Sequence, residues 1–265
     1  MKDIITIIAV FLVVLTGGCD KGKLDSPSYP PGKKKSYVQR YLATDTLTIL
    51  ERIGAIIENN ELNLGKTSLV RHEENKGRIF GLEDNIMLFA SLEWKEGFRD
   101  GFFDYPQGKG YDKKYAPMAG DTYYNAEPVF GLMSSPIAIV DTLQSIEITT
   151  DSDFSPELPA GTNLNHLFNV YFEDPYLVIQ NEYQQPDGGY RLSSVNYRIF
   201  PHVITGGKLD EINFPEKPFI GNTYMCVLDQ LPKERGEYKF KIRIKKTNGE
   251  VIENISRPIP IEGTN

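Results

Sequence analysis

Residue types on which many catalytic and metal sites depend are scarce in this chain. Its 265 residues include three histidines, two cysteines and a single tryptophan. These numbers are too low for most zinc sites, and two cysteines cannot build a disulfide framework. Basic residues are also outnumbered, 29 against 36 acidic ones, for a net charge of -7. Because binding a phosphate backbone needs a basic footprint, we expect no nucleic-acid partner.

The common enzyme signatures are absent as well. The histidines are far apart in the sequence and have no second ligand at metal-binding spacing: His72, His166 and His202. No Gly-x-Ser-x-Gly elbow occurs, and Asn60 stands where a phosphate loop ending in Gly65-Lys66-Thr67 would need glycine. We therefore expect a non-enzymatic protein with no catalytic residue, no cofactor and no metal ion.

Adjacent acidic residues do occur at sites where turns are expected. Glu83-Asp84 and Glu173-Asp174 are adjacent pairs, and in Asp151-Ser152-Asp153 a serine separates the two acids. The last could offer oxygens to calcium, but calcium takes about six to eight ligands. Simple turns are the favoured interpretation of all three.

Long hydrophobic runs are limited to the N-terminus. Ile4 to Leu15 is uncharged, and as a helix it would reach only about 18 Å, against about 30 Å for a hydrocarbon core. With Lys2 before it and small residues after it, the run is typical of a secretory signal. We expect residues 1–18 to be a signal peptide.

The end of this signal carries a resemblance. Leu15-Thr16-Gly17-Gly18-Cys19 resembles the lipobox of bacterial lipoproteins, although Thr16 takes the third place before the cysteine and Leu15 the fourth. The resemblance implies that Cys19 is lipidated, becomes the first residue and holds the chain to a bilayer through its acyl chains, such as palmitate. Residues 19–35, rich in Pro, Gly, Lys and Asp, would then be the lipidated cysteine and a flexible tether.

The second cysteine is left without an intrachain partner by this interpretation. Cys226 stands in the apolar stretch Tyr224 to Leu228. We expect it to be a small buried hydrophobic residue rather than a reactive thiol.

The C-terminal region, residues 136–265, has the clearest strand pattern. Apolar residues alternate with Lys or Arg from Tyr238 to Lys245, which predicts a strand with one buried face. Asn248-Gly249 predicts a hairpin turn with both residues at positive φ, followed by a return strand from Val251 to Ser256. Further strands are expected at Leu143–Ile148, Tyr176–Gln180, Tyr190–Phe200 and Tyr224–Leu228. Short strands at this spacing predict a mainly β protein with an antiparallel β-sandwich.

The N-terminal region, residues 36–135, is expected to be β-rich with a long irregular loop. Thr46 to Glu58 fits a helix face by its spacing, but its β-branched residues and Gly54 count against a helix. Leu50 to Ala55 has the same apolar spacing as Leu143 to Ile148, which favours a strand over a helix. Asn85 to Trp94 is apolar on both faces, which predicts a central strand. Gly97 to Asn125 is predicted to be a long irregular connection, either functional or flexible.

One segment resembles a feature of immunoglobulin-like domains. The segment from Glu234 to Phe240 is similar to their acidic-x-Gly-x-Tyr-x-Cys corner, with Phe240 in the place of the cysteine. The resemblance implies an immunoglobulin-like C-terminal half and a bond from the Tyr238 hydroxyl back to the backbone. An ordinary glycine turn entering a strand is the alternative.

A longer resemblance covers the middle of the chain. Ile139 to Phe154, and then Pro159 to Phe168, are similar to uncharacterised cell-envelope lipoproteins of Bacteroides and its relatives. The resemblance implies a bacterial envelope β protein and supplies no site residues. From the residues alone, Pro159 to Asn163 is interpreted as a turn into a helical turn capped by Asn163, with Leu164, Leu167 and Phe168 as its apolar face.

The one unusual feature of the composition is its content of aromatic residues, with 15 tyrosines and 14 phenylalanines. Many tyrosines stand in expected loops: Tyr105, Tyr111, Tyr115, Tyr123, Tyr124, Tyr183 and Tyr190. Exposed tyrosines suit contacts with sugars or proteins, while buried packing is the plainer interpretation.

We therefore expect a lipid-anchored outer-membrane protein that binds a glycan or a protein ligand. The alternative is a structural subunit of an outer-membrane or fimbria-like complex. Which membrane face carries it stays open.

Overall fold

The computed structural model describes most of the chain beyond the expected tether. The described residues are 38, 40–58, 61–64, 67–93, 98–99, 102–103, 111–122, 137–183, 190–193 and 203–264. The chain divides into two units, Met1–Lys34 and Lys35–Asn265, and every described residue belongs to the second. The expected signal peptide, Cys19 and the tether lie outside the described residues. Among the described residues, no helix is long and apolar enough to cross a membrane.

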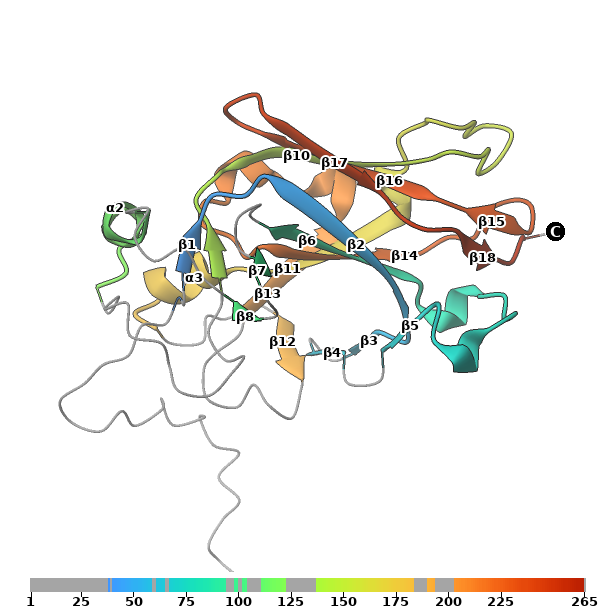
Figure 1. The fold of residues 1–265 in the computed structure, drawn as a ribbon, viewed down its shortest axis with the longest axis horizontal. Coiled ribbons are helices and arrows are strands. Elements are labelled where there is room, and N and C mark those ends of the chain that lie inside the picture. Colours follow the sequence, from blue (N-terminus) through green and yellow to red (C-terminus); the bar gives the residue numbers. More distant parts are fainter. Residues whose placement is uncertain are drawn as a thin grey trace, which may run out of the picture. The chain divides into compact units, whose positions relative to one another are not determined.

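The fold is mainly β, and its largest element is a nine-stranded sheet (Figure 1). In spatial order its strands are β3 (Ile56–Glu58), β4 (Glu61–Asn63), β12 (Tyr190–Ser193), β13 (Val203–Lys208), β11 (Phe168–Glu173), β14 (Thr223–Leu228), β6 (Met87–Glu93), β2 (Thr46–Ile53) and β5 (Ser68–Leu69). All neighbouring strands are antiparallel except β4 and β12. The N-terminal and C-terminal regions therefore contribute to one sheet.

A smaller antiparallel sheet packs over the large one. It consists of β10 (Leu143–Thr150), β16 (Phe240–Lys246) and β17 (Val251–Ile255), seen at the top of Figure 1. Along β16, Phe240, Ile242 and Ile244 are buried while the residues between them point outward. The alternation predicted from the sequence is confirmed.

The main core lies between these two sheets, and a second, smaller buried cluster includes Leu62, Met87 and Met225. Apolar side chains of β11 and β14 meet those of β10 and β16, and Phe168 packs edge-on against Phe240 with ring centroids 5.6 Å apart. At one edge the Asn254 side chain donates to the Leu47 carbonyl at 2.7 Å, which joins β17 to β2. Burial of this apolar surface is the main stabilising contribution to the fold.

Three short pairs complete the strands. β1 (Arg40–Leu42) pairs in parallel with β9 (Ile137–Ile139), and β15 (Gly236–Tyr238) pairs with β18 (Ile259–Ile261). The third pair, β7 with β8, belongs to the segment after Trp94 and is described below. At the entry to β16 the Tyr238 hydroxyl donates to the Glu234 carbonyl at 2.6 Å. The expected bond from this tyrosine to the backbone is confirmed.

One predicted strand is wrong. Residues 176–180 belong to a short helix, α3 (Pro175–Gln180). The Asp174 side chain caps it by accepting from the Leu177 backbone N–H at 3.2 Å, and Pro175 supplies the fixed φ that suits the first turn. The apolar run is one face of a helical turn, with Val178 and Ile179 buried.

The expected strands in the N-terminal region are confirmed. Thr46–Glu58 forms β2 and β3, separated at Gly54, which adopts a φ of 83°. β6 is central, between β14 and β2. Trp94 lies outside the described residues.

Gly97–Asn125 was predicted to be irregular, and its described parts contain regular elements. These are the pair β7 (Phe98–Arg99) and β8 (Phe102–Phe103), and the helix α2 (Tyr111–Met118). The prediction of an irregular loop is wrong for these residues. Pro117 lies inside α2, and a proline within a segment of the sequence argues against a helix there.

The β16–β17 hairpin is confirmed, but its turn is not the expected one. Gly249 has a φ of 89°, whereas Asn248 is not at positive φ. The Lys246 N–H donates to the Glu250 carbonyl at 2.8 Å, which leaves three residues in the loop. A three-residue loop needs only its last residue in the left-handed region.

The segment Pro159–Phe168 forms the expected turn and helical turn. Asn163 accepts from the Asn165 N–H at 2.8 Å before the 3₁₀ helix η3 (Asn165–Leu167). Leu164, Leu167 and Phe168 are buried in the main core. The turn and its apolar face are confirmed, but the cap predicted at Asn163 is wrong, because Leu164 takes the N-cap position and no side chain caps the helical turn.

Candidate functional site

Three tyrosines from separate elements surround Phe219. Tyr41 comes from β1, Tyr115 from α2 and Tyr176 from α3, with ring centroids 5.9, 6.3 and 5.9 Å from that of Phe219. Tyr41 and Tyr115 meet it edge-on, and Tyr176 is tilted by 45°. Both geometries are favourable for aromatic pairs. We call these four residues the Phe219 cluster.

The backbone around Phe219 is held in an unusual conformation. Phe219 has a φ of 54°, a left-handed value that costs a non-glycine residue about 1 kcal/mol or more. Ile220 and Gly221 bond to neighbouring strands on either side: the Ile139 N–H donates to the Ile220 carbonyl at 2.9 Å, and the Gly221 N–H donates to the Glu173 carbonyl at 2.7 Å. The surrounding structure therefore fixes the strained residue in place.

Glycine is required at the position after Ile220. A Cβ added to Gly221 would lie 2.8 Å from the Glu173 Cβ. The close approach lets this segment run against the end of β11. The close approach at Gly221 therefore fixes the position of Phe219 relative to the end of β11.

A buried carboxylate bonds to one member of the cluster, Tyr41, and to the neighbouring Tyr183. Asp121, just after α2, is only 4% exposed. Its Oδ2 accepts from the Tyr41 hydroxyl at 3.0 Å and its Oδ1 from the Tyr183 hydroxyl at 2.8 Å. Charge-assisted hydrogen bonds of this kind are stronger than neutral ones. Asp121 thus connects β1, α2 and the segment that follows α3.

The two helices are joined by a further bond. The Gln180 side chain of α3 donates to the Ala119 carbonyl, directly after α2, at 3.0 Å. Tyr183 itself has a φ of 62°, a second left-handed residue beside the site. Polar contacts therefore hold the two helices together at the site.

The outer surface of this region is apolar and aromatic. Tyr115, Tyr176 and Phe219 are half-buried, while Met118 is 61% and Leu177 37% exposed. The Tyr176 hydroxyl has no hydrogen-bond partner among the described residues. Flat rings with polar tips, held in fixed orientations, can contact a sugar ring or a peptide at low entropic cost.

A basic side chain borders the aromatic surface. Lys114 Nζ lies 4.7 Å from the centroid of the Tyr115 ring and 3.3 Å from its hydroxyl. A cation over a tyrosine face is attracted by the negative face of the ring. This lysine supplies the region with a hydrogen-bond donor.

The base of α3 carries a buried acid. Asp174 is 3% exposed, and its carboxylate lies 3.8 Å from Lys217 Nζ and 3.5 Å from the Thr205 hydroxyl. Burial raises the pKa of Asp174, and the Leu177 N–H and Lys217 oppose that shift only in part. Its role in the structure is to cap the helix that presents Tyr176.

The structure brings together only some of the tyrosines singled out from the sequence. Tyr115 and Tyr183 lie at the site, Tyr111 begins α2, and Tyr190 begins β12. Tyr105, Tyr123 and Tyr124 lie outside the described residues, as does Cys19. Sequence reasoning missed Tyr41, Tyr176, Asp121 and Phe219. The Asp174-Pro175 start signal could have found Tyr176; the others have no local signal.

The remaining candidates are placed apart from the cluster and have structural roles or lie at the surface. His72 is exposed and lies 3.5 Å from Glu74, His166 is in the 3₁₀ helix η3, and His202 lies outside the described residues. Asp84 accepts from the Gly81 N–H at 2.9 Å, and Asp153 from the Ala160 N–H at 2.8 Å. Within the described ranges, no group of three or more His, Cys, Asp or Glu could hold a metal ion.

Cys226 is buried in the core, as expected. It is fully buried on β14, and this burial raises the pKa of its thiol to about 12. The thiol therefore stays protonated and unreactive at neutral pH.

Comparison with protein-family models, with curated proteins and with solved structures finds no match to this chain.

Proposed function

We propose that this protein is a lipid-anchored, non-enzymatic binding module of a bacterial outer envelope, and that the Phe219 cluster contacts its ligand. The observation that carries the proposal is the pair of half-buried rings, Tyr115 and Tyr176, that pack on Phe219, beside Tyr41, whose hydroxyl is held by the buried Asp121. Fixed rings lose little conformational entropy on binding. A glycan is the ligand class that we put forward for testing.

The chemistry of the site supports a sugar ligand. The C–H face of a sugar ring stacks on aromatic side chains, and its hydroxyls need donors and acceptors nearby. Tyr176 on α3 offers both a ring and a hydroxyl. Lys114 on α2 and Gln180 on α3 are exposed polar residues of the same region.

The anchoring part of the proposal rests on the sequence. Cys19 after a short apolar run would take the lipid, and residues 20–35 would span about 50 Å when fully extended. That length would hold the folded unit clear of the headgroups. The bond between Tyr238 and Glu234, together with two sheets packed on one core, supports an immunoglobulin-like relationship for the C-terminal half.

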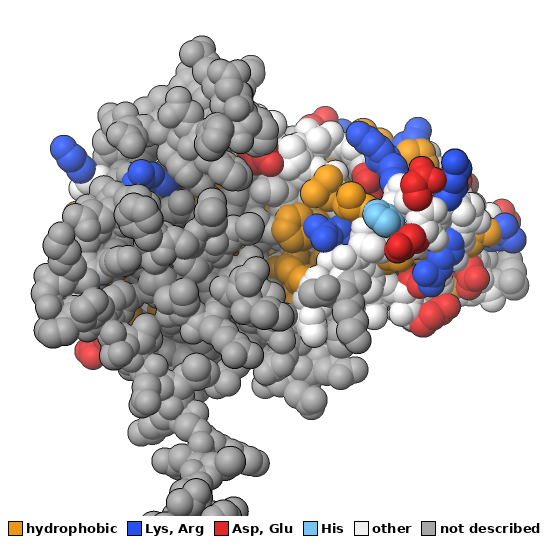
Figure 2. Space-filling view, turned by 60° about the horizontal axis from the view of Figure 1, so that its bottom comes forward, with side chains coloured by type: hydrophobic (Ala, Val, Ile, Leu, Met, Phe, Trp, Pro, Cys, Tyr) orange, Lys and Arg blue, Asp and Glu red, His pale blue; other side chains and the backbone are white. Residues whose placement is uncertain are grey.

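A second candidate, an assembly subunit, is favoured by exposed apolar side chains on the strands. Leu50 is 45% and Leu69 41% exposed on β2 and β5 of the large sheet, and Val251 and Ile255 are 39% and 49% exposed on β17. Figure 2 shows hydrophobic side chains gathered beside a basic one on one described face. Contiguous apolar patches of this kind mark protein contacts when they are large.

A glycan array tests the primary proposal. The purified full-length protein is labelled and applied beside Tyr176→Ala, with Leu82→Ala as the matched control. Leu82 is 42% exposed in the 3₁₀ helix η2 (Leu82–Asp84) and does not belong to the cluster. We expect signals that Tyr176→Ala loses and Leu82→Ala keeps. Silence of the wild type across the array would overturn the glycan proposal.

The assembly candidate has its own test. Envelope extracts are passed over the immobilised wild type and over a Leu50→Ser/Leu69→Ser variant. A partner that the wild type retains and the double variant loses supports assembly through the large sheet. Recovery of the same proteins by both contradicts it.

A further inference from the structure

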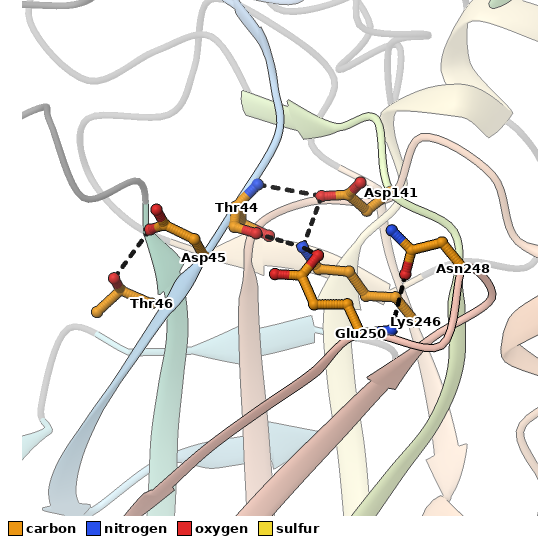
Figure 3. Close-up of polar contacts among 7 residues, drawn as sticks. All are labelled: Thr44, Asp45, Thr46, Asp141, Lys246, Asn248 and Glu250. Atoms are coloured by element: carbon orange, nitrogen blue, oxygen red, sulfur yellow. Dashed lines mark hydrogen bonds and ion pairs between the residues drawn. The ribbon is translucent and has the colours of Figure 1, made fainter.

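A buried lysine lies at the end of strand β16 and does not belong to the Phe219 cluster. Lys246, the last residue of β16, is only 2% exposed in its side chain. Its Nζ lies 2.9 Å from the Asp141 carboxylate and 3.0 Å from that of Glu250, and it donates to the Thr44 carbonyl (Figure 3). No water is needed to satisfy this ammonium, because three protein oxygens surround it.

Each partner is fixed by backbone bonds to a neighbouring segment. Asp141 stands between β9 and β10, where the Val140 N–H donates to the Leu42 carbonyl at 2.8 Å and the Thr247 N–H to the Thr142 carbonyl at 2.9 Å. The Thr44 N–H donates to Asp141 Oδ2 at 3.1 Å. The amine and the carboxyl carbon are therefore held close in one arrangement.

We propose that Lys246 and Asp141 join covalently, forming an amide between Nζ and Cγ of Asp141. Burying the Lys246 side chain, 2% exposed, against Asp141, 18% exposed, costs free energy that their attraction offsets only in part, and Glu250 at 44% exposed lies at the edge of the site. An amide removes both charges. Two groups held in contact also react as though each were present at a very high local concentration.

The residues around the pair supply the groups that the reaction needs. Glu250 takes a proton from Nζ and passes it to Oδ1 of Asp141, so that a neutral amine faces a protonated carboxyl group and its lone pair attacks Cγ. The Thr44 N–H donates to Oδ2, where negative charge develops in the tetrahedral intermediate. The Cγ–Oδ1 bond then breaks, and this oxygen leaves as water with the proton that Glu250 delivered and the second proton of the former ammonium. The N–Cγ bond replaces the C–O bond, and no oxidant is required.

The same chain provides a control pair. Lys241 Nζ lies 2.9 Å from Glu253, the same separation as in the buried pair, but both side chains are nearly half exposed, at 43% and 48%. Water stabilises these charges, so this pair stays an ion pair. Any difference between the two pairs then reports burial and the neighbouring groups rather than distance.

Peptide mapping by mass spectrometry tests the proposal. The full chain is expressed, purified in folded form, denatured and digested. We expect a branched peptide containing Asp141 and Lys246, lighter than the two linear peptides together by one water molecule, and no branched peptide joining Lys241 and Glu253. Linear peptides of full mass around both residues, from folded protein kept for days, would overturn the proposal.

Variants separate the covalent role from a merely structural one. In Asp141→Asn the same bond forms with loss of ammonia instead of water, so the branched peptide keeps the mass of the wild-type one. Glu250→Gln, which retains the hydrogen bond but cannot take up the proton, gives a folded protein with linear peptides. Branched peptide at wild-type yield from Glu250→Gln would contradict the assigned role of Glu250.

Discussion

Replacing Tyr238 by phenylalanine tests how the corner before β16 is stabilised. The change removes the 2.6 Å hydrogen bond to the Glu234 carbonyl and leaves the ring. Glu234 is exposed, so water can take over its carbonyl, and no buried acceptor is orphaned. We expect a loss of about 1 kcal/mol in the free energy of unfolding, the net worth of one such bond.

The alanine variant gives the scale for comparison. Tyr238 is 4% exposed, and its ring packs against Phe154 with centroids 5.8 Å apart. Tyr238→Ala loses this packing and leaves a cavity, which costs about 3–5 kcal/mol. Urea unfolding followed by circular dichroism measures both variants. Equal losses for Phe and Ala, or none for Phe, would refute the assignment of a separate hydrogen-bond contribution.

Three further predictions concern buried polar groups. Burial raises the thiol pKa of Cys226 to about 12, so we expect no alkylation of this residue in folded protein at pH 8 and rapid alkylation in urea. Peptide mapping measures both. Labelling of Cys226 in the folded state would contradict the prediction. Burial raises the pKa of Asp174, so the folded state holds this proton more tightly than the unfolded state and stability falls as pH rises from the unfolded pKa through the raised one. Asp174→Asn keeps a helix cap without the charge, and its stability relative to wild type increases over that pH range in urea titrations; a pH-independent difference would count against the raised pKa. Asp121→Asn cannot accept equally from two hydroxyls, and we expect a loss of about 1–3 kcal/mol, whereas an unchanged midpoint would refute the role of this carboxylate.

The strands were predictable where one face of a sheet is buried. The alternation in β16 and the apolar run of β6 follow directly from the need to bury one or both faces. The strand predicted at residues 176–180 was wrong because an apolar run this short shows neither the helical nor the strand period. The capping residue and proline before it carried the information that the run itself lacked.

The type of candidate site, an aromatic contact surface, was predictable, but most of its residues were not. The tyrosine content indicated a contact surface, but Tyr41, Tyr176 and Phe219 come from segments far apart in the sequence. Nothing local marks Phe219 as a left-handed residue or Asp121 as a buried acceptor. Their meeting depends on how β1, α2 and α3 pack, which is decided by tertiary contacts.

The most direct test of the binding site is calorimetric titration with the glycan that the array identifies. We predict that Tyr176→Ala binds it at least about tenfold more weakly than the wild type, equivalent to about 1.4 kcal/mol, while Leu82→Ala binds it with unchanged affinity. Equal affinities for wild type and Tyr176→Ala would contradict a ligand site at the Phe219 cluster.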